Sequence, residues 1–476
     1  MQTSFPSRIA SALADPNLQL ALDGNFERSR LKRASAMDAL PDADAVRDRA
    51  RAIRIEALSH LDTYLLQLEA AVQARGGVVH WASDAAEANR IVIEIAQTRD
   101  AKMIAKSKSM VSEEIKLNEA LESAGLRVVE TDLGEYILQL RGDRPSHIIA
   151  PAIHLRRSDV AELFEKHLGL PRTDDIAALT AAARVALRQV FLTADIGISG
   201  VNFGVAETGM LCLVTNEGNG RLCTTVPPVH IALMGIERVV PTLADLEIML
   251  RLLARSATGQ KITAYTTLLT GPRRPDEPDG PEELHLVLVD NGRSRVLGSE
   301  LAESLLCIRC GACLNVCPVY REIGGHAYGS VYPGPIGAIV SPALGGMSEF
   351  GELAQASSLC GACQDVCPVR IDIPSMLLKV RSAHLEETGG TNWLNFGIKI
   401  WSWIVRSPRR YRIAVSASGV ATRLIAKHGW IAKLPGPLAA WTRRRDFPAF
   451  ATDTFRDRFS RRNRVGVNEH GSVPDA

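Results

Sequence analysis

Apolar residues recur at helical spacing over a long stretch near the start of the chain. From Asp42 to Arg75 they repeat every three or four positions, and Gly76-Gly77 ends the pattern. Residues at this spacing share one face of a helix, and glycine commonly follows a helix end. We predict one long amphipathic helix here, packed on the next domain or on a partner, after an irregular segment at residues 1–40. The apolar positions are Val46, Ile53, Leu61, Leu65, Leu68 and Val72.

Between residues 78 and about 290, short β-rich runs alternate with helical patterns. Such alternation is typical of an α/β domain with a largely parallel sheet. A Pro-rich surface loop at 271–283 precedes the last strand, so we place the end of this domain at residue 290. The runs that favour strands are 78–81, 103–105, 128–129, 148–150, 196–199, 211–215, 231–234 and 284–289. The patterns that favour helices are 84–98, 112–124 and 174–189.

These patterns divide the chain into four segments. The length of 476 residues suits two to four domains at roughly 100–200 residues each. The first residues lack the basic start and apolar core of a signal peptide, and no apolar run approaches 18 residues, so we expect a cytoplasmic protein. The segments are a helical N-terminal part (1–76), the α/β domain (77–290), a cysteine-rich module (291–390, with a helix at 348–357) and a C-terminal segment (391–476).

Charge is concentrated in the C-terminal segment. The whole chain carries +2, whereas residues 391–476 hold 16 Lys/Arg against 5 Asp/Glu, together with five of the six tryptophans. A basic amphipathic helix with tryptophan either lies on an anionic membrane surface or buries its apolar face in a partner. We favour a partner subunit over the membrane, and no nucleic-acid recognition motif accompanies the charge. The helical pattern is Trp393, Ile400, Trp401 and Ile404, followed by Arg406, Arg409, Arg410 and Arg412.

Seven of the nine cysteines lie within 61 residues. The first four have the spacing C-x2-C-x2-C-x3-C-P, the run of bacterial two-cluster ferredoxins, in which the fourth cysteine binds the other cluster. Gly311 lets the backbone approach the cluster closely. Zinc is the alternative, but zinc sites pair two short motifs across a spacer and match this run poorly. The motif consists of Cys307, Cys310, Cys313, Cys317 and Pro318.

A second motif, C-x2-C-x3-C-P, repeats the first but begins with Ser357 where the first has Cys307. Crossed ligation assigns Cys307, Cys310, Cys313 and Cys367 to cluster one. It assigns Cys317, Cys360 and Cys363 to cluster two, which lacks a fourth thiolate. That cluster is therefore [3Fe–4S], or [4Fe–4S] with an open iron or an oxygen ligand. Ser357 and Ser358 are the candidate oxygen donors.

Five longer motifs lie at residues 105–114, 130–137, 206–209, 215–221 and 227–230. They resemble those of a known family, the lactate-utilisation iron–sulfur protein B family. The resemblance covers nearly the whole chain. It implies a middle domain similar in fold to sugar-phosphate isomerases and coenzyme A transferases, and seven cysteine ligands at the positions given above. It also implies an electron carrier that acts with two companion proteins in oxidising L-lactate to pyruvate.

Other polar residues are weaker candidates. The Gly-rich segment Thr215–Arg221 either holds an anion or forms a tight turn, and we favour the turn. Lys106 and Lys108 either meet an anion or lie in a solvated loop. Glu207 matches the nucleophile of coenzyme A transferases only at the level of fold. His147, His154 and His230 are more often core histidines than bases, and Cys212 and Cys223 are expected to be buried apolar residues.

The sequence therefore predicts an electron-transfer subunit. The 42 residues between Cys317 and Cys360 exceed a minimal ferredoxin and resemble the helical modules of respiratory iron–sulfur subunits, which relay electrons. Two alternatives stay open. One is an enzyme that binds a hydroxy acid or acyl group in the α/β domain, and the other is a redox-sensing scaffold.

Overall fold

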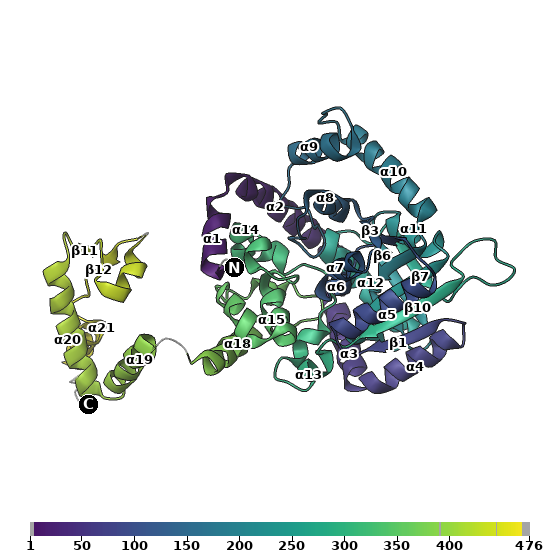
Figure 1. Ribbon diagram of the computed structural model, residues 1–476. Coiled ribbons are helices and arrows are strands. Elements are labelled where there is room, and N and C mark those ends of the chain that lie inside the picture. Colours follow the sequence, from purple (N-terminus) through teal and green to yellow (C-terminus); the bar gives the residue numbers. More distant parts are fainter. Residues whose placement is uncertain (1–3, 390–391, 444, 469–476) are drawn as a thin grey trace. The chain divides into compact units, whose positions relative to one another are not determined.

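The computed structural model describes residues 4–389, 392–443 and 445–468 (Figure 1). The chain forms two compact units, one up to Thr388 and one from Gly389 onward. The first unit contains the α/β domain and the cysteine-rich module, and we describe each unit by itself.

A six-stranded parallel sheet forms the centre of the first unit. The strand order is β1-β10-β7-β4-β2-β3, and every neighbouring pair is parallel. All seven residues of β7 are buried, as expected for a central strand covered on both faces. The sheet confirms the predicted α/β class. Its strands are β1 (Val78–Ala82), β2 (Met103–Lys106), β3 (Arg127–Glu130), β4 (Ile196–Gly200), β7 (Val229–Gly235) and β10 (Glu283–Val289).

One predicted strand is wrong. Residues 148–150 lie in an irregular segment, because the backbone N–H groups of Ile149 and Ala150 both donate to Nδ1 of His147 instead of to a neighbouring strand. The predicted helix 112–124 is also interrupted, since Lys116 adopts a left-handed conformation with φ of 54°. The structure has α6 (Met110–Glu114) and α7 (Leu117–Ser123) in its place.

A second sheet packs beside the first, and the sequence predicted only its strand β6 in advance. The order is β8-β5-β6-β9, with β5 antiparallel to β6 and parallel to β8. With three and two residues, β5 and β8 are too short for a periodicity to be recognised, whereas β9 has five residues and was also missed. Its strands are β5 (Phe203–Val205), β6 (Met210–Thr215), β8 (Val239–Val240) and β9 (Tyr265–Leu269).

Helices cover the sheets. In Figure 1, α9 and α10 lie along the upper edge of the first unit. Of the helices in the described residues, α10 alone is long and apolar enough to cross a membrane, by length and composition only. It packs against α9 through Leu179 and Ala183. The helices are α5 (Ala85–Thr98), α8 (Leu133–Arg141), α9 (Arg157–Leu168), α10 (Ile176–Thr193), α11 (Asn219–Thr225) and α12 (Leu243–Thr258).

The N-terminal part differs from the prediction in two ways. The single long helix is two, α3 (Ala43–Ser59) and α4 (Leu61–Gln73), because His60 between them leaves helical geometry. The segment predicted to be irregular forms α1 (Phe5–Ala14) and α2 (Pro16–Asp38). Contacts distant in sequence hold α2: Gln19 Nε2, for example, donates to the carbonyl oxygen of Glu322 at 2.6 Å. Such tertiary contacts leave no periodic signal.

The cysteine-rich module is built from short helices and 3-10 turns. The predicted helix 348–357 is a short α-helix followed by a 3-10 turn that ends before Ser357. The α-helices are α13 (Arg293–Leu297), α14 (Pro318–Ile323), α15 (Gly334–Gly345), α16 (Met347–Phe350), α17 (Ala362–Asp365) and α18 (Ile373–Thr388). The 3-10 turns beside the cysteines are η2 (Ala302–Leu306), η3 (Leu314–Val316) and η5 (Gly351–Gln355).

The second unit is mainly helical. Trp401 and Trp403 are exposed on its first helix, and the guanidinium of Arg410 lies 4.2 Å from the ring of Trp403. The side chain of Trp393 is outside the described ones. The elements are α19 (Asn392–Val405), α20 (Pro408–Ile425), β11 (Trp430–Ile431), β12 (Phe447–Pro448) and α21 (Phe455–Asn468).

Candidate iron–sulfur site

The two cysteine motifs have the same backbone conformation. Arg309 and Gly311 of the first motif have φ of 58° and 72°, and Leu359 and Gly361 of the second have 55° and 87°. Side chains rarely adopt a left-handed φ, so four such values at matched positions mark a repeated structure. At Gly311 a Cβ would also meet Ile149 at 3.2 Å, so glycine is favoured there by both conformation and space.

Backbone N–H groups point at the thiols. The amide of Arg309 donates to Sγ of Cys307, and the amide of Tyr320 to Sγ of Cys317, both at 3.4 Å. In the second motif Ile371 donates to Sγ of Cys367 at 3.4 Å. Donors aimed at sulfur stabilise the thiolate, the form that binds metal.

The seven thiols fall into two electrostatic groups. Burial, with additions from Cys307 and Cys367, raises the pKa of Cys310 to about 12. Burial also raises the pKa of Cys313, with additions from Cys307 and Cys310. These four thiols form the first group, which joins the first motif to the last cysteine of the second.

The second group contains the other three thiols. Burial raises the pKa of Cys363 to about 12, with Cys317 adding to the effect. Burial raises the pKa of Cys317 as well, and Cys360 adds to it. Cys360 is exposed, so this group reaches the protein surface.

The donor set fits an iron–sulfur cofactor. All nine cysteines lie among the described residues and none forms a disulfide. Buried thiols with high pKa values are costly to ionise unless a metal takes the charge, and soft sulfur donors select such metals. Cys212 and Cys223 are buried apart from the seven, and burial raises the pKa of each to about 12.

The first thiol group lies at the carboxyl edge of the parallel sheet, where two buried arginines hold its backbone. Arg238 donates from Nη1 to the carbonyl oxygen of Cys307 at 3.0 Å. Arg54 donates from Nη2 to the carbonyl oxygen of Leu305 at 2.9 Å and also reaches that of Glu237. Burial lowers the pKa of both arginines, and Cys307 acts on each in the opposite direction. Helix α3 and the α/β domain thus each bring positive charge to this group.

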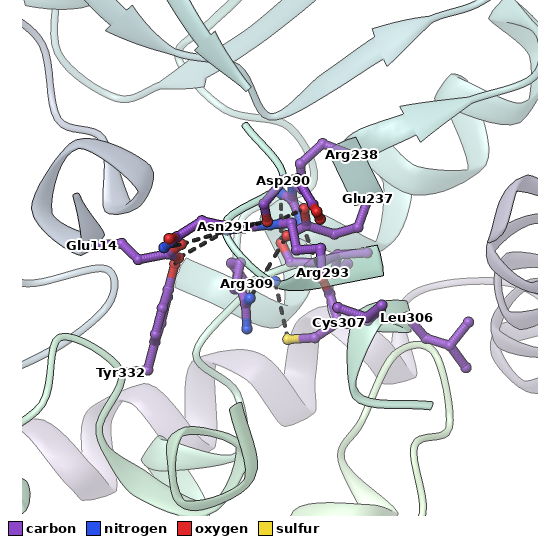
Figure 2. Close-up of polar contacts among 12 residues, drawn as sticks. Glu114, Glu237, Arg238, Asp290, Asn291, Arg293, Leu306, Cys307, Arg309 and Tyr332 are labelled. Carbon is purple, nitrogen blue, oxygen red and sulfur yellow. Dashed lines mark hydrogen bonds and ion pairs between the residues drawn. The ribbon is translucent and has the colours of Figure 1, made fainter. Parts of the chain in front are cut away.

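A buried ion-pair network continues from these arginines (Figure 2). Arg293 bridges Glu237, at 2.6 Å from Nε, and Glu114, at 2.8 Å from Nη1. Tyr332 donates to Oε2 of Glu114 at 2.6 Å, and its ring lies 4.4 Å from the guanidinium of Arg309. Burial alone would raise the pKa of Glu237, but Arg293, then Arg309 and Arg238, hold it at about 2. Glu237 is therefore a carboxylate that ties the module to the sheet.

The N-terminal helices supply further positive charge. Arg33 donates from Nη2 to the carbonyl oxygen of Val366 at 2.5 Å. Arg47 donates from Nη2 to the carbonyl oxygen of Cys367 at 2.9 Å. By contrast, the groups that shift the pKa of Cys317 are backbone amides and Cys360, beside burial itself. The two thiol groups therefore lie in unequal electrostatic surroundings.

The predicted histidines act as structural residues. Nε2 of His147 lies 3.1 Å from Oδ1 of Asn315, and burial, then Lys108, lowers the pKa of His147 to about 4. His154 lies 3.1 Å from Asp143. Nε2 of His230 lies 2.8 Å from the hydroxyl of Ser199.

The remaining candidates are also engaged. Lys106 is fully buried and forms ion pairs with Glu130 at 2.6 Å and Glu113 at 3.1 Å, so these carboxylates balance its charge inside the domain. Lys108 donates to the carbonyl oxygen of Ile149 at 3.0 Å. Glu207 accepts the amide of Leu243 at the start of α12 at 3.0 Å. The guanidinium of Arg221, in the Gly-rich segment, lies 5.9 Å from the ring of Tyr265.

Sequence reasoning missed the arginine and glutamate network. Its members are scattered from Arg54 to Tyr332, and only the fold brings them together. One signal was present, because Glu237 and Arg238 interrupt the otherwise apolar run 231–240. Charged residues there call for buried partners.

Comparison with known proteins assigns each part of the chain. Residues 65–289 match the family model of the LUD domain, 303–371 a 4Fe-4S dicluster domain, and 384–464 the C-terminal part of lactate utilisation protein B. Lactate utilization protein B of Bacillus pumilus is 46% identical over 97% of this chain and 98% of its own. The chain belongs to the lactate utilization protein B family. The expected family and iron–sulfur chemistry are therefore confirmed.

Other relatives agree. Lactate utilization protein B of Bacillus licheniformis is 47% identical, over 97% of each chain. The uncharacterized electron transport protein YkgF of Escherichia coli is 45% identical over 96% of this chain and 97% of its own. A DUF162 family protein of Deinococcus radiodurans, known from its crystal structure, is 15% identical over 48% of this chain and 98% of its own. Its TM-score of 0.29 is too low to carry an argument.

Proposed function

We propose that this protein carries electrons through two iron–sulfur clusters during the oxidation of L-lactate to pyruvate, together with companion lactate-utilisation proteins. The observation that carries the proposal is the pair of thiol groups, each drawn from both motifs. Relatives along the full chain bear the name lactate utilization protein B, and one bears the name electron transport protein.

The ligand assignment follows the electrostatic grouping. Cys307, Cys310, Cys313 and Cys367 would hold cluster one, and Cys317, Cys360 and Cys363 would hold cluster two. Crossing of the fourth cysteine is the rule for this spacing. Crossed ligation would bring the two clusters close together, as electron transfer between them requires.

The clusters, when bound, supply one-electron redox chemistry. The chain provides the thiolates, the backbone N–H groups aimed at them, and a shell that excludes water around the first group. Positive charge near a cluster favours its reduced form, so Arg54 and Arg238 would raise the reduction potential of cluster one. The exposed Cys360 gives cluster two access to a redox partner at the surface.

We assign the contact with companion proteins to the second unit. Its first helix exposes Trp401 and Trp403 beside Arg410. Tryptophan and arginine are enriched where proteins bind one another. We place the protein in the cytoplasm, and binding of this unit to anionic vesicles in the absence of companions would favour a membrane surface instead.

Anaerobic purification followed by iron and sulfide quantitation and EPR tests the proposal. We expect two clusters per chain that lactate reduces only when the companion proteins are present. A folded but iron-free protein would overturn it. Lactate oxidation by the isolated chain with an artificial acceptor would instead indicate an enzyme, and clusters that no lactate-linked protein reduces would indicate a sensor.

A further inference from the structure

The second thiol group has three sulfur donors, whereas the first has four. The position that matches Cys307 is Ser357. We propose that Oγ of Ser357 is the fourth protein ligand of cluster two, which would make that cluster a four-iron centre with one oxygen ligand. The proposal rests on the two-cluster function proposed above and deepens it.

The backbone around Ser357 repeats that around Cys307. Two residues after each of them the chain is left-handed, at Arg309 and Leu359, with φ of 58° and 55°. A 3-10 turn precedes both positions, η2 before Cys307 and η5 before Ser357. The backbone therefore places the side chain of Ser357 in its motif as it places that of Cys307 in the first motif.

The same hydrogen bonds follow in each motif. The amides of Leu314 and Gln364 donate to the carbonyl oxygens of Gly311 and Gly361 at 3.0 and 2.9 Å. The amide of the last cysteine in each motif also donates to the carbonyl oxygen of the residue three positions earlier. The distance is 3.3 Å for Cys317 and 3.1 Å in the second motif. The correspondence thus extends over the whole motif on both sides of the cluster position.

The side chain of Ser357 is oriented like that of Cys307. The amide of Arg309 donates to Sγ of Cys307 at 3.4 Å, and the amide of Leu359 donates to Oγ of Ser357 at 3.1 Å. The oxygen therefore occupies the place of a ligating sulfur. Ser358 does not, because it corresponds to Ile308, which is not a ligand position, and its side chain is exposed.

Arg381 fixes this segment. It donates from Nε to the carbonyl oxygen of Ala354 and from Nη2 to that of Ser357, both at 2.9 Å. Its charge also favours an anion at the serine. The cation and the Leu359 amide are the surroundings that an alkoxide ligand requires.

Binding releases one proton. The Fe–O bond forms as the O–H bond of Ser357 breaks, and the proton leaves to solvent, to which the half-buried serine is open. Among the described residues no acceptor for the hydroxyl proton lies within hydrogen-bonding distance, so the proton is not held elsewhere. An alkoxide is a harder donor than a thiolate, so one iron of cluster two should differ from the others.

Three variants of the full chain test the proposal: Ser357→Ala, Ser357→Cys and, as the matched control, Ser358→Ala. Each is purified without oxygen and compared with the wild type by iron content, Mössbauer spectroscopy and potentiometric EPR. The signal of cluster one reports whether each variant is folded.

We expect a four-iron cluster two in the wild type, with one distinct iron. Ser357→Ala should lose that iron and give a three-iron EPR signal. Ser357→Cys should keep the iron but shift the potential and spectrum of cluster two alone, and Ser358→Ala should match the wild type. If Ser357→Ala also loses cluster one, the Ser357→Cys spectrum decides.

Two results would overturn the ligand assignment while leaving the proposed function intact. One is a wild-type cluster two with three irons. The other is a pair of Ser357 variants whose cluster two matches the wild type in iron content, spectrum and potential. A wild type that binds fewer than two clusters would contradict the proposed function itself.

Discussion

Arg238, at the carboxyl edge of the sheet, donates to the carbonyl oxygen of Cys307 at 3.0 Å. A buried unit charge near a redox centre is worth on the order of 1–2 kcal/mol, or roughly 40–90 mV for one electron. We expect Arg238→Gln to lower the potential of cluster one by about that amount. Potentiometric EPR measures the shift.

The control for this change is Arg90→Gln, which removes an exposed guanidinium paired with Glu94. It should leave both potentials unchanged. An equal shift of the two clusters in Arg238→Gln would contradict the local origin of the effect.

Crossed ligation makes Cys367 and Cys363 distinguishable, although they lie in one motif. Cys367→Ser should remove or alter the EPR signal of cluster one, because Cys367 joins the thiol group of the first motif. Cys363→Ser should alter cluster two. If both variants affect the same cluster, each motif holds its own cluster and the crossed assignment is wrong.

Glu237→Gln should destabilise the protein. Glu237 is buried and lies 2.6 Å from Nε of Arg293, so the substitution leaves a buried guanidinium short of its counter-charge. Breaking a buried pair in this way costs about 3–5 kcal/mol. Urea unfolding followed by circular dichroism measures the loss. The exposed Glu94→Gln, which breaks the surface pair with Arg90, should cost about 0–1 kcal/mol.

His230 should make the stability fall in mild acid. Burial, with a small contribution from His285, lowers the pKa of His230 to about 3. The unfolded state then binds a proton below about pH 6.5 that the folded state excludes. The contribution of His230 to the free energy of unfolding should therefore be constant above pH 7 and decrease by up to about 1.4 kcal/mol per pH unit below 6.5.

The measurement is urea unfolding between pH 7.5 and 5. His230→Gln should weaken this dependence, whereas the exposed His60→Gln should retain it. An unchanged slope in His230→Gln would show that another group binds the proton.

The sequence predicted the parts of the fold that repeat regularly. Parallel strands such as β7 and β10 are buried on both faces and therefore read as continuous apolar runs. The seven cysteines were recognisable because a cluster fixes their spacing. Both patterns are local, so each can be recognised in the sequence without knowledge of the fold.

Features that depend on distant contacts were missed. The sequence of helix α2 has little amphipathic pattern. Contacts with distant residues help to hold this helix, such as the hydrogen bond from Arg33 to the carbonyl oxygen of Val366. The network of Glu114, Glu237 and Arg293 lies on three separate elements. The strand predicted at 148–150 failed because the side chain of His147 takes the amides that a sheet would use.

The N-terminal helices bind the end of the second motif, 333 positions later in the case of Arg33 and Val366. A chain growing on the ribosome exposes these helices long before that motif is made. Cysteine 367 is among the last residues of the first unit to be synthesised, and in the crossed arrangement it completes cluster one. In that arrangement cluster one can be completed only after residue 367 has been made, and chains that end before it cannot hold a complete first cluster.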